Sequence, residues 1–152
     1  MQTIHRIAAA LLGVTLWSAS ASADGDVEAG KNVFKRCQTC HMVGPNAKNR
    51  IGPPLNGLFG RKAGTVEGFK YSPVMSALGE KGLEWNPTDF AGYLTDPKKW
   101  LPVKAKELGL SCDDLKNCRN NMAFAGLKKE KEIEDVVAYL MTFDADGKPK
   151  TN

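Results

Sequence analysis

Cys37-Gln38-Thr39-Cys40-His41 is the stretch that decides the fold of this 152-residue chain. Two cysteines and a histidine in the spacing C-x-x-C-H are the attachment signature of a c-type haem. Each thiol can form a thioether with one vinyl group of the porphyrin, which places the next residue beneath the iron. An imidazole nitrogen there can serve as the proximal ligand. The stretch therefore predicts one covalent haem c, held by Cys37 and Cys40, with His41 on the iron.

Two other kinds of site use similar residues. A C-x-x-C pair can be a thioredoxin-like redox couple, and two cysteines with a histidine can be part of a zinc site. The zinc alternative is short of ligands, because the only further cysteines are Cys112 and Cys118 and the only other histidine is His5. The haem interpretation accounts for all three residues of the motif.

The first 23 residues have the organisation of a secretory signal peptide. A positive start at His5 and Arg6 precedes an apolar core at 7–17, and Ala21-Ser22-Ala23 supplies a cleavage site. An uncleaved anchor is the alternative, but this core is shorter than the ~20 residues that span a bilayer. We expect a signal peptide at 1–23, a single domain at 24–152, and a periplasmic location, where thioethers and disulfides form.

Removal of the leader has consequences for charge and for iron ligation. The formal net charge of +4 falls by one with Arg6, and no basic run interleaved with aromatic residues indicates nucleic-acid binding. His5 also leaves, so His41 becomes the only histidine. This count excludes multihaem cytochromes and iron held between two imidazoles.

Helical periodicity is clearest near the two ends of the domain. The segment 26–35 places apolar residues and Gly30 on one stripe and leads into the haem motif. The last helix has an acidic first turn and a longer apolar stripe, formed by Ile133, Val136, Val137, Leu140 and Met141. The residues around Gly147 and Pro149 read as a solvated tail.

Shorter helices are expected between these two. Ser72-Pro73 and Asn86-Pro87 each combine a capping residue with proline at the first helical position, and Pro97 is expected to end the second helix. The segment 44–68 is rich in glycine and proline and should be mostly loop. No strand alternation is visible, so the expected fold class is all-α, small and rich in loops.

A one-electron carrier needs both axial positions of the iron filled by the protein, and methionine sulfur is the natural second ligand once histidine is used up. Met42 follows His41 directly and cannot reach the opposite face, and Met141 belongs to the apolar stripe of the last helix. Met122 lies in an irregular polar segment where no helical stripe accounts for it. Spacing and context favour Met122, with Met75 as the alternative.

Several motifs together resemble the class I cytochromes c, specifically the bacterial cytochrome c2 branch. They run from about Asp26 to Thr142 and include Gly52-Pro53-Pro54-Leu55, Leu58-Phe59-Gly60-Arg61, Gly68-Phe69-Lys70-Tyr71-Ser72, Tyr93-Leu94-Thr95-Asp96-Pro97-Lys98-Lys99 and Asn121-Met122-Ala123-Phe124-Ala125-Gly126. The resemblance implies the small cytochrome c fold, in which N- and C-terminal helices pack together and shorter helices and loops surround one covalent haem.

The resemblance also implies roles for individual residues. Met122 becomes the distal ligand, and the carbonyl of Pro53 would accept the ring N–H of His41. The other expected haem-binding residues are Arg61, Tyr71 and Trp85 at the propionates, Tyr93 near the methionine sulfur, and Phe124 beside the exposed haem edge.

The chain departs from the general family pattern between Pro102 and Met122. This segment is longer than in mitochondrial cytochromes c, as in the long c2 proteins, and it contains Cys112 and Cys118. In an exported protein, a pair this close predicts a local disulfide, with two free thiols as the alternative. Such a bridge would restrain the segment that carries Met122.

These features predict a soluble, monomeric periplasmic electron carrier of a photosynthetic or respiratory chain, and not an enzyme. Its partners would be membrane redox complexes: a bc1-type complex, a reaction centre or a terminal oxidase. Lysines are expected to rim the haem edge and steer docking, namely Lys31, Lys35, Lys98, Lys99, Lys104, Lys106, Lys128 and Lys129. The alternatives are a haem enzyme or gas sensor with an open distal site, or a subunit tethered in a larger complex.

Overall fold

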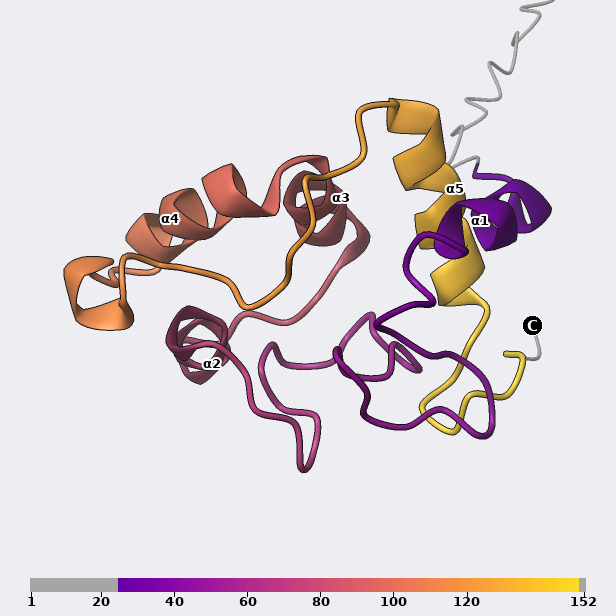
Figure 1. Cartoon of the computed structure of the whole chain (residues 1–152), viewed down its shortest axis with the longest axis horizontal. Coiled ribbons are helices and arrows are strands. Elements are labelled where there is room, and N and C mark those ends of the chain that lie inside the picture. The colour runs from indigo at the N-terminus through magenta and orange to yellow at the C-terminus, as the bar shows by residue number, and fades with distance from the viewer. Residues whose placement is uncertain (1–24, 151–152) are drawn as a thin grey trace, which may run out of the picture.

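The structure, a computed structural model, describes residues 25–150, so the expected signal peptide lies outside the described residues. The elements in this part of the chain are α1 (Val27–Phe34), α2 (Pro73–Glu80), α3 (Pro87–Thr95), α4 (Pro97–Glu107), the 3-10 turn η1 (Asp113–Leu115) and α5 (Glu130–Met141) (Figure 1). Two isolated β-bridges are the only strand-like pairings within 25–150. The all-α prediction is therefore confirmed.

Side-chain caps begin the short helices where the sequence placed them. The Ser72 hydroxyl accepts the N–H of Met75 at the start of α2, and the Asn86 side chain accepts the N–H of Asp89 at the start of α3. Each cap is followed by proline at the first helical position, which needs no hydrogen-bond partner for its nitrogen. Across the described chain, no helix has the length and apolar composition to cross a bilayer.

Helix α4 was not predicted from the sequence. Pro97 was expected only to end the preceding helix, but Asp96 both ends α3 and caps α4, accepting the N–H of Lys99 at 3.2 Å. The helix then continues through Pro102 to Glu107. The irregular connection to α5 is thus residues 108–129, which we call the strap (Figure 1).

Helices α1 and α5 pack against each other, as expected for the two ends of the domain (Figure 1). Gly30 lies at the closest approach: a Cβ there would be 2.5 Å from the Asp135 carbonyl carbon and 2.8 Å from Tyr139 Cβ. The N–H of Asp26 donates to Asp135 at 2.7 Å across the same contact. Phe34 packs on Tyr139 with ring centroids 5.5 Å apart. This pair of helices fixes the point at which α1 delivers the chain to Cys37.

Two expectations about the C-terminal part of the domain are wrong. Met141 was assigned to the core but is 42% exposed, because it ends the helix on the outward side of the stripe. Gly147 was placed in a solvated tail but is buried, and its backbone packs on the carbonyl of Gly44. The chain after α5 therefore folds back onto the 44–68 loop.

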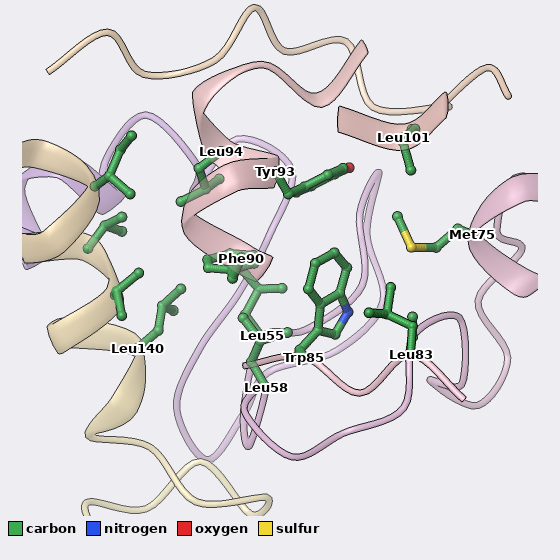
Figure 2. Close-up of a cluster of buried hydrophobic side chains, with 14 of the residues drawn as sticks. Leu55, Leu58, Met75, Leu83, Trp85, Phe90, Tyr93, Leu94, Leu101 and Leu140 are labelled. Carbon is green, nitrogen blue, oxygen red and sulfur yellow. The ribbon is translucent and has the colours of Figure 1, made fainter. Parts of the chain in front are cut away.

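The core is contributed by all parts of the domain, and its largest side chains surround one common space. Figure 2 shows Phe90, Tyr93 and Trp85 between the helices, with Leu140 of α5 on one side and Met75 of α2 on the other. Trp85 contacts Phe90 and Tyr93 with ring centroids 5.6 and 5.3 Å apart. The core is thus a shell of apolar side chains, and the space it encloses is the candidate site.

The close approach at Gly30 gives a stability prediction. Gly30→Ala should destabilise the protein by about 1–3 kcal/mol, because the added methyl group overpacks a backbone contact that cannot give way. Chemical denaturation of the holoprotein measures it. Lys31→Ala, at an exposed neighbouring position, should remain within about 0.5 kcal/mol of wild type. Equal effects of the two substitutions would contradict the tight α1–α5 contact.

Candidate haem site

Residues from both ends of the domain meet in one large cavity. Cys37, Cys40, His41 and Met122 all line it, and about 1330 Å³ of atom-free space lies within it and its open mouth. The walls are mainly apolar and include the aromatic side chains of the core. Such a cavity is the usual form of a binding site for a large planar or drug-sized group.

The haem motif reaches the cavity because the chain keeps turning after α1 ends. The N–H of Cys37 donates to the Phe34 carbonyl at 2.7 Å, and the N–H of His41 donates to the Cys37 carbonyl at 2.8 Å. These turns carry the motif directly from the α1–α5 contact, so its position is fixed by the most tightly packed part of the fold.

The imidazole of His41 is held by one hydrogen bond and one close packing contact. Its Nδ1 lies 2.7 Å from the Pro53 carbonyl oxygen, which can only accept, so Nδ1 carries the hydrogen. A Cβ on Gly52 would lie 2.7 Å from Nδ1 and 2.8 Å from Nε2, so only glycine leaves room for the ring. Burial lowers the pKa of His41. The ring is neutral at pH 7, and Nε2 keeps the lone pair that a metal ligand needs.

The electrostatics of the cysteines weigh against the redox-couple alternative. Cys37 and Cys40 are not joined to each other in the structure. Burial raises the pKa of the Cys37 thiol, although Arg36 opposes this. A reactive C-x-x-C pair requires the opposite shift, toward a stabilised thiolate. The described residues also contain no group of three His, Cys, Asp or Glu side chains arranged to hold a metal ion, which leaves the zinc alternative without a ligand set.

Met122 and Met75 both line the cavity, so position alone does not separate them. Met75 is 6% exposed and lies on α2 within the core. Met122 comes from the strap, and its sulfur accepts a hydrogen bond from the Tyr93 hydroxyl at 3.6 Å. The amide of Asn120 donates in turn to the Tyr93 oxygen. Only Met122 thus has a polar partner that orients its sulfur.

Tyr93 is the most strongly perturbed titratable group of the site. Burial raises the pKa of its hydroxyl to about 12, although the hydrogen bond from Asn120 acts in the opposite direction. The hydroxyl therefore keeps its hydrogen throughout the physiological range and can donate it to the methionine sulfur. Tyr93 also packs on Trp85, which in turn stacks on Trp100 with centroids 5.7 Å apart.

The remaining predicted site residues also line the cavity. Arg61 donates to the carbonyl oxygens of Asn56 at 2.9 Å and Pro54 at 3.2 Å, which ties the loop after Pro53 to its guanidinium. Burial raises the pKa of Tyr71, and the charge of Arg61 opposes this rise. The other two are Trp85, which is 7% exposed, and Phe124, which is partly buried.

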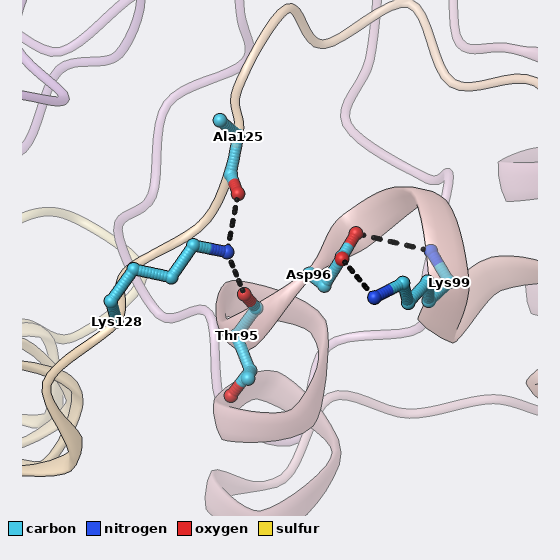
Figure 3. Close-up of polar contacts among 5 residues, drawn as sticks. All are labelled: Thr95, Asp96, Lys99, Ala125 and Lys128. Carbon is cyan, nitrogen blue, oxygen red and sulfur yellow. Dashed lines mark hydrogen bonds and ion pairs between the residues drawn. The ribbon is translucent and has the colours of Figure 1, made fainter.

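Beyond Met122, Lys128 attaches the strap to the end of α3 (Figure 3). The Lys128 ammonium donates to the carbonyl oxygens of Ala125 at 3.0 Å and Thr95 at 3.4 Å. The N–H of Leu127 donates to the Leu94 carbonyl at 2.8 Å. The carbonyls of Leu94 and Thr95 are at the C-terminal end of α3, where a helix has no partners of its own and favours a cation.

Before Met122 the strap is closed by a bridge between Cys112 and Cys118, with Cα atoms 4.8 Å apart. Cys118 is 3% exposed and belongs to the core. Lys116, Asn117 and Cys118 all have left-handed backbone conformations, with φ of 52°, 57° and 51°. Met122 therefore lies between a cross-linked turn and the attachment to α3.

Comparisons with known proteins fit this geometry. No protein-family model matches the chain. It is 45% identical over 123 residues to the cytochrome c2 of Afifella marina, covering 81% of this chain and 86% of that protein. It is 42% identical over 126 residues to the cytochrome c-550 of Nitrobacter winogradskyi, covering 83% and 98%. The structure of cytochrome c2 from Rhodospirillum centenum matches with a TM-score of 0.71 at 43% identity, covering 79% of this chain and 99% of that one. The chain belongs to the class I c-type cytochromes, in the cytochrome c2 branch.

Membership of this family confirms the small cytochrome c fold and makes the chain an electron-transfer protein with one covalent haem c. The residues present fit that group. The thiols of Cys37 and Cys40 line the cavity. The neutral imidazole of His41 is oriented by the Pro53 carbonyl and occupies the space beside Gly52. The apolar walls suit the face of a porphyrin, and Arg61 supplies a cation for its acidic groups.

Sequence reasoning missed Asn120 and the attachment of the strap to α3. The segment around Met122 was recognised as polar, but nothing in the sequence indicated that Asn120 meets Tyr93, 27 positions away. The missed helix α4 had a readable signal in Asp96-Pro97, which repeats the cap-then-proline pattern of the two helices that were predicted.

Proposed function

We propose that this cytochrome c2 is a soluble, monomeric periplasmic carrier of single electrons, with its haem iron held between His41 and Met122. The observation that supports this most directly is the pair of oriented ligand atoms in one cavity. Pro53 leaves Nε2 of His41 free, and the Tyr93 hydroxyl contacts the sulfur of Met122. Cys37 and Cys40 would each form a thioether bond to one vinyl group of the haem.

The bound haem supplies the Fe(III)/Fe(II) couple, and the chain supplies a fixed environment for it. His41 and Met122 would together hold the iron and leave it no site for oxygen or peroxide, so that a change of oxidation state would require little movement. The buried aromatic wall at Phe90, Trp85 and Tyr93 would keep water from the ring. Arg61, Tyr71 and Trp85 would neutralise or hydrogen-bond the propionates, and Phe124 would cover the exposed edge.

Export is proposed from residues 1–23, whose pattern is that of a cleaved signal peptide. The Cys112–Cys118 bridge suits the same compartment, because disulfides persist in the oxidising periplasm and are rare in the cytoplasm.

The partners we propose are membrane redox complexes with acidic docking faces: a bc1-type complex, a reaction centre or a terminal oxidase. The structure narrows the lysines available for such docking. Lys104 is held by Asp89 at 2.7 Å and Glu107 at 2.8 Å, and its side chain is only 19% exposed. The Lys128 ammonium is already hydrogen-bonded to the carbonyl oxygens of Thr95 and Ala125. The exposed lysines left for steering are Lys31, Lys35, Lys98, Lys99, Lys106 and Lys129. Lys99 and Lys129 also make ion pairs, with Asp96 at 3.5 Å and Glu132 at 3.7 Å, but their side chains stay 87% and 78% exposed.

Replacement of the two cavity methionines tests the axial ligand. Met122→Ala should abolish the iron–sulfur charge-transfer band of the oxidised protein and lower the midpoint potential, because methionine ligation raises it. Met75→Ala is the matched control: it should cost about 2–5 kcal/mol in stability through the core cavity it creates, yet keep the band. Visible spectra, redox titration and chemical denaturation measure these effects.

The same spectra separate the carrier from an enzyme or sensor. Wild-type protein should be low-spin in both oxidation states. A high-spin, five-coordinate oxidised spectrum, or a band that disappears in Met75→Ala and persists in Met122→Ala, would refute the proposed ligation.

The docking proposal predicts a dependence on salt. The second-order rate of electron transfer to a purified bc1-type complex or terminal oxidase should fall about tenfold or more as ionic strength rises from about 0.01 M to 0.5 M, because salt screens steering charges. Stopped-flow kinetics measures it, with a small uncharged reductant as the control that should be nearly insensitive to salt. A flat profile with the physiological partner would remove the steering claim.

A further inference from the structure

Three side chains form a continuous row from the strap to the proposed iron ligand. The Asn120 amide donates to the Tyr93 oxygen, and the Tyr93 hydroxyl donates to the Met122 sulfur at 3.6 Å. Tyr93 is 5% exposed, so its hydroxyl has few other partners to choose from. Asn120 and Met122 are separated by one residue, which means that the strap contacts the same hydroxyl twice.

The direction of these bonds is set by what each atom can do. An amide nitrogen donates only, and a thioether sulfur accepts only. Because Asn120 presents its NH₂ group, the Tyr93 oxygen must accept, and the single hydroxyl hydrogen is left for Met122. An acceptor at position 120 would draw that hydrogen to itself and leave the sulfur without a partner.

The turn before Asn120 holds its amide in this place. Cys118, two residues earlier, is buried in the core and bridged to Cys112. The N–H of Asn117 donates to the Cys112 carbonyl at 2.8 Å, which closes the turn a second time. The position of Asn120 is therefore determined by the cross-linked part of the strap, before the chain reaches Met122.

A hydrogen bond on an axial ligand changes the electronics of the metal. A donor to the sulfur withdraws electron density from it, so the sulfur stabilises the more positive iron less well. The reduced state is favoured in consequence. The same bond also sets the orientation of the sulfur lone pairs.

We propose that Asn120 is a positioning residue for electron transfer: its N–H occupies the Tyr93 oxygen, directs the Tyr93 hydrogen to Met122 and so favours the reduced protein. This inference rests on the proposed ligation by Met122. Asn120 also lines the cavity, but its hydrogen bond is to Tyr93, and its proposed effect on the sulfur acts through that hydroxyl.

The test compares two aspartate substitutions in the holoprotein. Asn120→Asp keeps the shape of the side chain but offers only carboxylate acceptors, which take the Tyr93 hydrogen. Asn121→Asp is the matched control, because it adds the same charge one residue away at an exposed position. At a fixed applied potential, the ratio of oxidised to reduced protein should rise about fivefold more in Asn120→Asp than in Asn121→Asp, the effect of about one hydrogen bond. The iron–sulfur band should shift only in Asn120→Asp.

Repeating both substitutions in a Tyr93→Phe background separates the hydrogen bond from simple charge. Without the hydroxyl there is no hydrogen to redirect, so the fivefold difference between the two aspartates should vanish. If Asn120→Asp does not fold, Asn120→Ala against Asn121→Ala replaces it. Alanine does not compete for the hydrogen, but it removes the N–H that occupies the Tyr93 oxygen and so no longer fixes the hydroxyl on the sulfur, which predicts a smaller change in the same direction.

The outcomes distinguish this inference from the function on which it rests. A wild-type protein without an iron–sulfur band would overturn the proposed ligation itself. A wild-type protein with the band, but with equal changes in Asn120→Asp and Asn121→Asp, or with an unequal change that survives Tyr93→Phe, would overturn only the role of Asn120.

Discussion

The covalent attachment of the haem that we propose at Cys37 and Cys40 is the constraint on which the rest of this account depends. Part of the core is packed solid, as at Leu78 and Leu101, but its aromatic side chains line a space of the kind that a haem would fill. The α1–α5 contact fixes where the two thiols lie, and Gly30 makes that contact possible. The prosthetic group is therefore part of the packing as well as the source of the chemistry.

The two proposed iron ligands are held in different ways. His41 is positioned by its neighbours in the sequence, through the turns after α1 and the carbonyl of Pro53. Met122 is positioned by the strap, which is closed before it by the Cys112–Cys118 bridge and attached after it to the end of α3. Tyr93 gives the strap a further contact with α3, since it lies in that helix and meets the strap at Asn120 and Met122.

Much of this could be predicted from the sequence, and the failures have physical reasons. Features that depend on residues close together in the sequence could be predicted, because the fold of the rest of the chain does not change them. They are the C-x-x-C-H motif, the capped starts of α2 and α3 and the apolar stripe of α5. Met141 was expected in the core but is exposed, because the end of the helical stripe turns outward. Lys104 was expected at the docking rim, but it forms an ion pair with Asp89, which comes from another helix. The Asn120–Tyr93 contact joins α3 to the strap across 27 positions, and no pattern of residue types encodes it.

The mass of the denatured protein tests the central claim most directly. Isolated from cells that attach haem to c-type cytochromes, unfolded and treated with an alkylating reagent without reduction, it should weigh its amino acids from residue 24 onward plus one haem, with no alkyl group added. That result requires two thioethers at Cys37 and Cys40 and a disulfide between Cys112 and Cys118. A mass equal to the polypeptide alone, with alkylation at Cys37 and Cys40, would contradict the account.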